Sequence, residues 1–157
     1  MNIGSIRRID ELGRIVIPKN IRQELKIRPE DNLKIYIKED KIVIEKYSEM
    51  SREIEIEKAI AKTIKEIIKA EVIVTDKEKV IIGESKLKKE LPEKITSIIR
   101  KRNKITITKN NKNIYINPII INGDAIGSII VITNKEIDYL ITNTVDTMTR
   151  FLIKYIE

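Results

Sequence analysis

The spacing of the hydrophobic residues changes once along the chain, around residues 47–52, and this change constrains the fold more than any other feature. Before it, apolar and polar residues alternate over short runs, which is typical of β-strands. After it, isoleucines recur at helical spacing, which predicts an amphipathic helix. The isoleucines of this helical stripe are Ile56, Ile60, Ile64 and Ile67. The sequence therefore predicts two units, residues 1–50 and residues 51–157.

Short strands and one short helix are predicted for the first unit. The strand-like segments are residues 5–9, residues 14–17 and the two arms of the alternating segment 33–46, which predicts a β-hairpin. The first two segments flank a turn that ends on Gly13, which tolerates the positive φ that such a turn can need. Pro18 suits the first turn of a helix, which is predicted at residues 19–26.

This first unit is too small to be stable as a single copy. About fifty residues bury little apolar surface, and the chain has no cysteine with which to form a disulfide. We therefore expect the unit to associate with a second copy of itself, and intertwining of the two chains is one way to do so.

The second unit is predicted to run helix, two strands, helix, three strands, helix. Its strand-like segments are 71–75, 79–83, 104–108, 113–121 and 125–133. Residues 92–102 and 136–156 predict the two later helices, and Asn122-Gly123-Asp124 predicts a tight hairpin turn. A central antiparallel sheet with long helices on one face would bury the apolar stripes, so the expected fold class is α+β. The stripe of the last helix is formed by Ile137, Ile141, Val145, Met148, Leu152 and Tyr155.

The distribution of charge indicates a polyanionic partner. The chain has 31 Lys and Arg against 24 Asp and Glu, a formal net charge of +7. Residues 1–28 hold seven basic residues against three acidic ones, and most of these basic residues are arginines, whereas the rest of the chain prefers lysine. Arginine makes bidentate contacts to phosphate and to base edges that lysine cannot reproduce.

Composition also argues against several classes of chemistry. The chain has no histidine and no cysteine, which excludes a Ser-His-Asp triad, a thiolate nucleophile and an ordinary zinc site. We therefore expect no enzymatic activity, no cofactor and no metal. No apolar run is long enough to span a bilayer, so we expect a cytoplasmic protein without a membrane partner.

A specific motif occupies residues 4–18. It combines a basic strand, the sequence Asp-Glu-Leu-Gly-Arg and an aliphatic strand that ends in proline. With residues 19–47, it resembles the AbrB-type swapped-hairpin family of bacterial transition-state regulators. The resemblance implies an intertwined dimer in which arginines on one face bind double-stranded DNA. Carried over to this chain, these arginines are Arg7, Arg8, Arg14 and Arg22. Gln23 stands where relatives usually have a second basic residue.

Two alternatives concern the basic residues. The N-terminal arginines could form a solvated surface with ordinary ion pairs, such as Arg14 with Asp10 or Glu11. Conversely, the basic residues at 100–104 could form a second nucleic-acid patch, but cations are also favoured at the C-terminus of a helix. We favour DNA binding for the first group and the helix-end explanation for the second.

The whole chain resembles the stage V sporulation protein T family, in which an AbrB-type module precedes a GAF domain. The best local match is residues 117–127. The connection at 109–113 is short where ligand-binding GAF domains build a lid, which argues against small-molecule sensing and leaves any ligand unknown. The resemblance implies a sporulation-type transcriptional regulator of AT-rich promoters, dimeric through its first unit and tetrameric through its second. The alternative is a MazE-type antitoxin that binds its own promoter and a toxin; a folded second unit argues against it.

Overall fold

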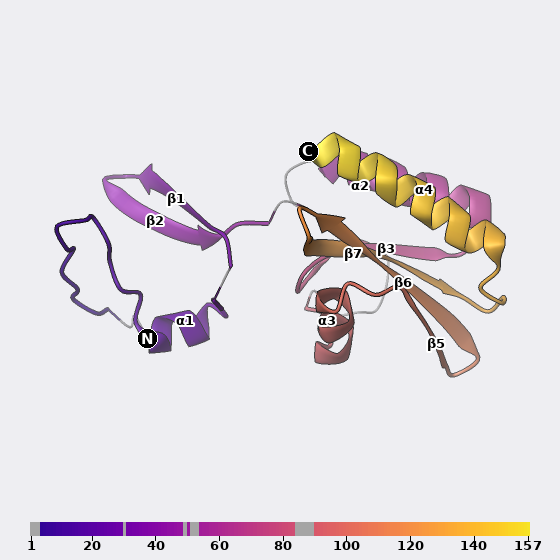
Figure 1. Cartoon of the computed structure of the whole chain (residues 1–157), viewed down its shortest axis with the longest axis horizontal. Helices are drawn as coiled ribbons and strands as arrows, with labels where there is room; N and C mark the ends of the chain where they lie inside the picture. Colours follow the sequence, from indigo (N-terminus) through magenta and orange to yellow (C-terminus); the bar gives the residue numbers. More distant parts are fainter. Residues whose placement is uncertain (1–3, 30, 49, 51–53, 84–89) are drawn as a thin grey trace. The chain divides into compact units, whose positions relative to one another are not determined.

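The computed structural model describes residues 4–29, 31–48, 50, 54–83 and 90–157. The chain divides into two compact units, Met1–Tyr47 and Ser48–Glu157, and each is described by itself. Both helices and antiparallel strands are present (Figure 1), so the predicted α+β class is confirmed.

The first unit contains a short helix and a β-hairpin. Helix α1 spans Lys19–Glu24, and strands β1 (Leu33–Lys38) and β2 (Lys41–Lys46) pair antiparallel. The turn between the strands has φ values of +49° at Glu39 and +59° at Asp40, and both residues lie in the left-handed region typical of a two-residue hairpin turn. The hairpin predicted over residues 33–46 is therefore confirmed.

The prediction of two strands at residues 5–9 and 14–17 was wrong for the chain taken singly. Neither segment forms a strand ladder, although the turn between them is closed by two backbone hydrogen bonds. Gly13 N–H donates to the Asp10 carbonyl at 3.0 Å, and Asp10 N–H donates to the Arg14 carbonyl at 3.1 Å. An alternating pattern marks residues that suit a strand, but a ladder also needs a neighbouring strand, and the described part of one chain does not supply it here.

A lysine ties the α1–β1 connection to the end of the hairpin. Lys46 Nζ lies 3.1 Å from Asp31 Oδ2 and donates to the Lys26 carbonyl at 3.0 Å. The same Asp31 oxygen accepts the Arg28 N–H at 2.8 Å. These contacts link the segment after α1 to the end of β2, in a unit in which no described residue is buried.

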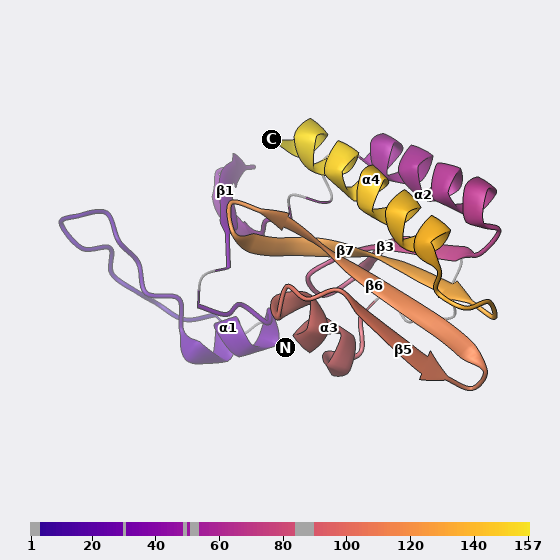
Figure 2. The same ribbon diagram turned by 45° about the vertical axis from the view of Figure 1, so that its right-hand side comes forward.

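The second unit is built on a five-stranded antiparallel sheet with the strand order β4-β3-β7-β6-β5. Its strands are β3 (Glu71–Asp76), β4 (Val80–Ile82), β5 (Ile105–Lys109), β6 (Lys112–Ile121) and β7 (Asp124–Thr133). Its helices are α2 (Ile54–Ile68), α3 (Glu93–Arg100) and α4 (Tyr139–Ile156). Figures 1 and 2 show α2 and α4 side by side on one face of the sheet and α3 on the other. The predicted sheet with long helices on one face is confirmed.

Two hydrophobic clusters hold these layers together. The larger lies between the sheet and the long helices and includes the fully buried Ile64, Val145 and Leu152. The smaller lies under α3 and includes the fully buried Ile73 and Ile99. Helix α4 begins where the Asp138 carboxylate accepts the Ile141 N–H at 2.9 Å, a typical N-cap.

Two members of the predicted helical stripes point away from the core. Ile67 is 47% exposed and Tyr155 is 49% exposed. In α2 the neighbouring Ile68 is buried instead. The face of α2 that packs on the sheet contains Ile60, Ile64 and Ile68, which are four residues apart. Ile67 lies at the margin of this face.

Strands β6 and β7 are joined by an exposed turn at residues 122–124, and β7 packs tightly further along, at Gly127. Asn122 and Gly123 have positive φ, which confirms the predicted hairpin turn. A Cβ at Gly127 would lie 2.1 Å from the Thr75 carbonyl oxygen and 3.0 Å from Met50 Cγ. Met50 itself is fully buried in the larger cluster. The chain therefore enters the second unit through a residue anchored in its core.

Candidate nucleic-acid interface

Arg14 is held by a turn that folds around Asp10. Asp10 Oδ1 accepts the N–H groups of Leu12 at 3.1 Å and Arg14 at 2.7 Å. Asp10 Oδ2 accepts Arg14 Nε–H at 2.7 Å. The Arg14 side chain is nevertheless 73% exposed. One carboxylate thus closes the turn with one oxygen and orients an exposed guanidinium with the other.

The hydrogen bonds at Asp10 also affect its ionisation. The Arg14 N–H and then the Arg14 side chain lower the pKa of the Asp10 carboxyl below its ordinary value. The carboxylate is therefore charged at neutral pH. The ion pair that the sequence offered as an alternative for Arg14 is present, and it engages only one of the five N–H donors of the guanidinium.

The other three predicted arginines are exposed and lie on separate segments. Arg7 and Arg8 precede the turn, and Arg22 lies in the last turn of α1. Among the described residues, none of these three has an ion pair in the structure. A single chain thus presents four arginines to solvent, and among the described residues only Arg14 of these four contacts an acid.

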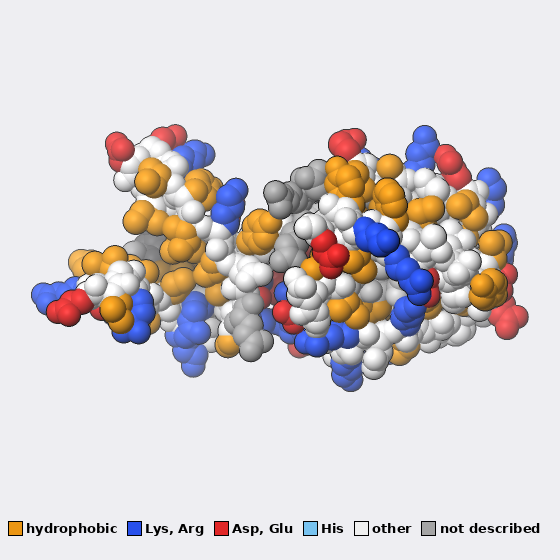
Figure 3. All heavy atoms as spheres, turned by 45° about the horizontal axis from the view of Figure 1, so that its top comes forward, with side chains coloured by type: hydrophobic (Ala, Val, Ile, Leu, Met, Phe, Trp, Pro, Cys, Tyr) orange, Lys and Arg blue, Asp and Glu red, His pale blue; other side chains and the backbone are white. Residues whose placement is uncertain are grey.

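Apolar side chains of the same unit are exposed as well. No described residue of the first unit is buried. On the hairpin, Ile37 and Ile42 are paired across the two strands and are 79% and 75% exposed. Figure 3 shows such apolar side chains at the surface of this unit. The large exposed hydrophobic residues of the unit are Ile6, Ile9, Leu12, Ile15, Val16, Leu25, Ile35, Ile37, Ile42 and Tyr47.

The second basic group is largely neutralised by acids. Arg100 Nη2 lies 3.6 Å from Glu78 Oε1, and Arg102 Nη2 lies 3.3 Å from Asp124 Oδ1. Lys104 Nζ lies 2.5 Å from Asp146 Oδ2. Lys101 is exposed. These basic residues therefore have a structural explanation, as the sequence favoured. The ion pairs account for them more directly than the helix dipole does.

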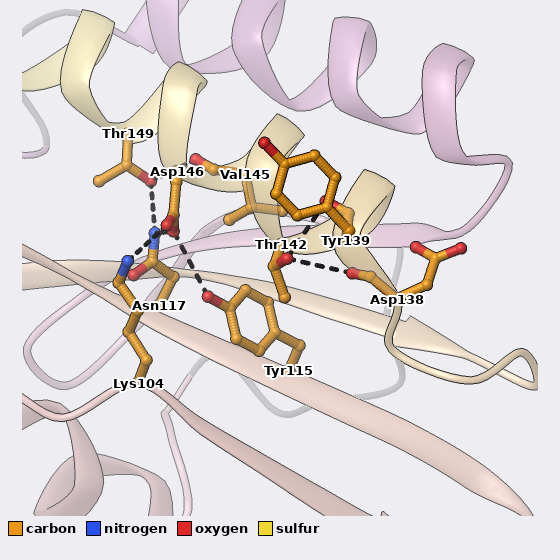
Figure 4. A network of polar contacts seen from close by, with 9 residues as sticks. All are labelled: Lys104, Tyr115, Asn117, Asp138, Tyr139, Thr142, Val145, Asp146 and Thr149. Carbon is orange, nitrogen blue, oxygen red and sulfur yellow. Dashed lines mark hydrogen bonds and ion pairs between the residues drawn. The ribbon is translucent and has the colours of Figure 1, made fainter.

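Sequence reasoning missed a polar network between α4 and β6 (Figure 4). Asp146 Oδ1 accepts from Asn117 Nδ2 at 3.2 Å and from the Tyr115 hydroxyl at 3.4 Å. Asn117 Nδ2 also donates to Thr149 Oγ1 at 2.9 Å, and Lys104 binds the other oxygen of Asp146. In the sequence, this network is indicated only by two polar residues, Asn117 and Thr149, which lie on otherwise apolar faces of β6 and α4.

This network fixes the long C-terminal helix on the sheet. Burial and the nearby Asp146 charge raise the pKa of Tyr115 to about 12, so the hydroxyl stays protonated and donates.

Among the described residues, no group of acids is arranged to hold a metal ion. No helix in the part of the chain that the structure describes is long and apolar enough to cross a membrane.

Two family models match the chain, one over each unit. Residues 6–51 match the family described as "Antidote-toxin recognition MazE, bacterial antitoxin", and residues 53–157 match "Stage V sporulation protein T C-terminal, transcription factor". Stage V sporulation protein T of Bacillus subtilis (strain 168) is 30% identical over an alignment 176 positions long, which covers 98% of this chain and 97% of that protein.

Two shorter relatives match the first unit. Transition state regulatory protein AbrB of the same organism is 48% identical over 44 residues, which cover 28% of this chain and 46% of AbrB. The putative transition state regulator Abh is 44% identical over 46 residues, which cover 29% of this chain and 50% of Abh.

A solved structure shares the fold of the second unit. The GAF domain/HD domain protein from Geobacter sulfurreducens superposes with a TM-score of 0.53 over 68% of this chain and 95% of that chain, at 12% identity. The likeness shows the fold alone, and it confirms the predicted GAF-like architecture. The first unit of the chain is related to AbrB, and stage V sporulation protein T matches the chain over both units. The chain therefore belongs to the family of transcription regulators represented by stage V sporulation protein T.

Proposed function

We propose that this chain binds double-stranded DNA at AT-rich promoters and regulates sporulation-type gene expression. In this proposal residues 1–50 bind DNA and residues 51–157 serve regulation and assembly. The observation that carries it is the combination of exposed arginines and exposed isoleucines in one small unit. The residues proposed to contact DNA are Arg7, Arg8, Arg14 and Arg22.

The exposed isoleucines support an intertwined dimer. Ile35, Ile37 and Ile42 lie on one face of the hairpin, since residues two apart on a strand share a face and Ile37 is paired with Ile42. Large apolar side chains in contact with water are costly, and a second copy can cover them. Residues 5–9 and 14–17 would then find the strand neighbours that a single chain lacks.

The charges support a phosphate-led mode of binding. A dimer presents two copies of each arginine, and arginines on phosphates fix the position of a protein on the duplex. AT-rich DNA has a narrow minor groove with an enhanced negative potential, which attracts arginine and permits recognition by shape. A protein that acts on promoter DNA in this way works in the cytoplasm, as proposed.

Assembly through the second unit is a further part of this proposal. Phe151 is 56% exposed on α4, and Leu140 and Tyr155 lie close to whole helical turns away from it. Figure 3 shows apolar side chains on the helix-covered face of this unit. Pairing of two such faces would make a tetramer from two N-terminal dimers and raise the effective concentration of binding modules on DNA.

An antitoxin function is the second candidate, because the family matched by residues 6–51 is described by antitoxin activity. It is the weaker candidate, since the described residues of the second unit form a folded domain, and residues 53–157 match a transcription-factor family. A MazE-type antitoxin would be expected to bind its toxin through a tail that is unstructured until bound.

A pair of single substitutions tests the proposal. Arg14→Ala and Lys101→Ala each remove one positive charge from an exposed side chain. Fluorescence anisotropy with duplex DNA should show a loss of affinity for Arg14→Ala and little change for Lys101→Ala. Size-exclusion chromatography and circular dichroism should show unchanged assembly and helix content in both. Equal losses of affinity in the two variants would contradict the assignment.

A further inference from the structure

We propose that Asp10 is a specificity-determining residue, which holds Arg14 so that this arginine contacts base edges while the other arginines contact phosphates. The inference rests on the proposed DNA binding and divides the arginines into two kinds. Its basis is the contact of Asp10 Oδ2 with Arg14 Nε–H at 2.7 Å beside an otherwise exposed guanidinium.

The charge of the Asp10–Arg14 pair favours base edges over phosphates. The Asp10–Arg14 pair has no net charge, and its carboxylate repels a phosphate that approaches the guanidinium. Base edges are neutral acceptors, so they do not meet this repulsion. Arg7, Arg8 and Arg22 have no acidic partner among the described residues, and their full charge favours phosphates.

The orientation of the guanidinium also suits a contact with a base edge. With Nε–H bound to Asp10, the two Nη groups of Arg14 are left as a fork that can donate to two acceptors. Bidentate contacts of this kind discriminate between bases in the grooves of DNA. Holding the side chain before DNA arrives also reduces the entropy lost when the contact forms.

The two oxygens of Asp10 have different roles, and one substitution separates them. Oδ1 closes the turn by accepting the N–H groups of Leu12 and Arg14, whereas Oδ2 holds the guanidinium. In Asp10→Asn the amide oxygen can keep the turn closed. The amide nitrogen then faces Arg14 Nε–H as a second donor, so the contact to the guanidinium is lost.

The matched control is Asp40→Asn. Asp40 lies in the turn of the hairpin in the same unit and is exposed, with φ +59°. Its substitution changes the charge by the same amount, and asparagine tolerates this conformation. Any effect of charge alone on DNA affinity should therefore appear in both variants.

The experiment measures the affinity of the full chain for two duplexes: one enriched by selection with the wild-type protein, and its scrambled counterpart. The ratio of the two dissociation constants is the discrimination. Asp10→Asn should reduce the discrimination about tenfold, within the range of one bidentate base contact. Its affinity for the scrambled duplex should stay equal or rise, with a steeper dependence on salt, because Arg14 becomes free to contact phosphates. Asp40→Asn should keep the wild-type discrimination.

Two further measurements separate positioning from folding. The Arg14 Nε–H resonance in the NMR spectrum should be shifted and slow to exchange in the wild type and lose both properties in Asp10→Asn, while the Leu12 amide resonance stays in place. In an Arg14→Lys background, Asp10→Asn should cause no further loss of discrimination. Unchanged discrimination in Asp10→Asn, or an equal loss of affinity for both duplexes, would overturn the inference. If the wild type binds neither duplex, the proposed function fails and the inference fails with it.

Discussion

Substitution of Ile37 by threonine should weaken the proposed dimer of the first unit far more than its exposure in a single chain suggests. Ile37 is 79% exposed and is paired with Ile42, which is 75% exposed on the same face of the hairpin. In an isolated chain, a polar residue at such a position costs almost nothing. In the proposed dimer, the same side chain is part of the shared core, where threonine buries a hydroxyl in place of apolar surface.

The expected magnitude follows from burial. Moving a largely exposed isoleucine into an apolar interface contributes about 1.5–3 kcal/mol. Because a symmetric dimer contains Ile37 twice, the substitution should reduce the free energy of dimerisation by roughly 3–6 kcal/mol. This corresponds to a dissociation constant raised by a factor of about a hundred to ten thousand.

Sedimentation equilibrium and concentration-dependent melting of residues 1–47 measure this change directly. The wild-type fragment should sediment as a dimer, with a melting temperature that rises with protein concentration. Ile37→Thr should populate monomer that has lost its structure. The control is Lys38→Thr, on the opposite face of the same strand, which should behave as the wild type does. A folded monomer of either the wild type or Ile37→Thr would refute the reasoning.

Three further outcomes are expected of the second unit. Gly127→Ala should lower its stability by about 3 kcal/mol in thermal melting, because the added methyl group would lie 2.1 Å from the Thr75 carbonyl oxygen; an unchanged melting temperature would contradict the packing described. Since the folded pKa of Tyr115 is raised from 10.0 to about 12, its contribution to stability is present below pH 10 and should be lost as pH rises toward 12, and Tyr115→Phe should reduce this loss in melts across that range. Phe151→Asp should convert a tetramer of the intact chain into a dimer in light scattering, whereas a wild-type chain that is already dimeric at tens of micromolar would contradict assembly through α4.

The parts of the fold that sequence predicted best are those set by local rules. The turn at Asn122-Gly123 needs positive φ, which these residue types supply, and the alternating residues 33–46 form their hairpin with near neighbours in sequence. The contact of Asp10 with Arg14 was also accessible as an alternative, because the two residues are four positions apart.

The parts that sequence did not predict depend on distant partners. Residues 5–9 and 14–17 have a strand pattern, but a pattern does not say which strand lies beside them or on which chain. The sequence left a basic patch at residues 100–104 open as an alternative, because the acidic partners of Arg102 and Lys104 are distant. These partners, Asp124 and Asp146, are 22 and 42 positions away. The burial of Met50 likewise depends on its contact with β7, which no local periodicity indicates.

The salt dependence of DNA binding by the intact chain tests the central claim most directly. If Arg7, Arg8 and Arg22 of both copies bind phosphates, about six phosphates are neutralised, and the slope of log K against log salt should be about −5. Replacement of these three arginines by glutamine should bring the slope close to zero, whereas replacement of Lys79, Lys94 and Lys101, which are exposed in the second unit, should leave it unchanged. A wild-type slope near zero, or a steep slope that survives loss of the three arginines, would contradict DNA binding through the first unit.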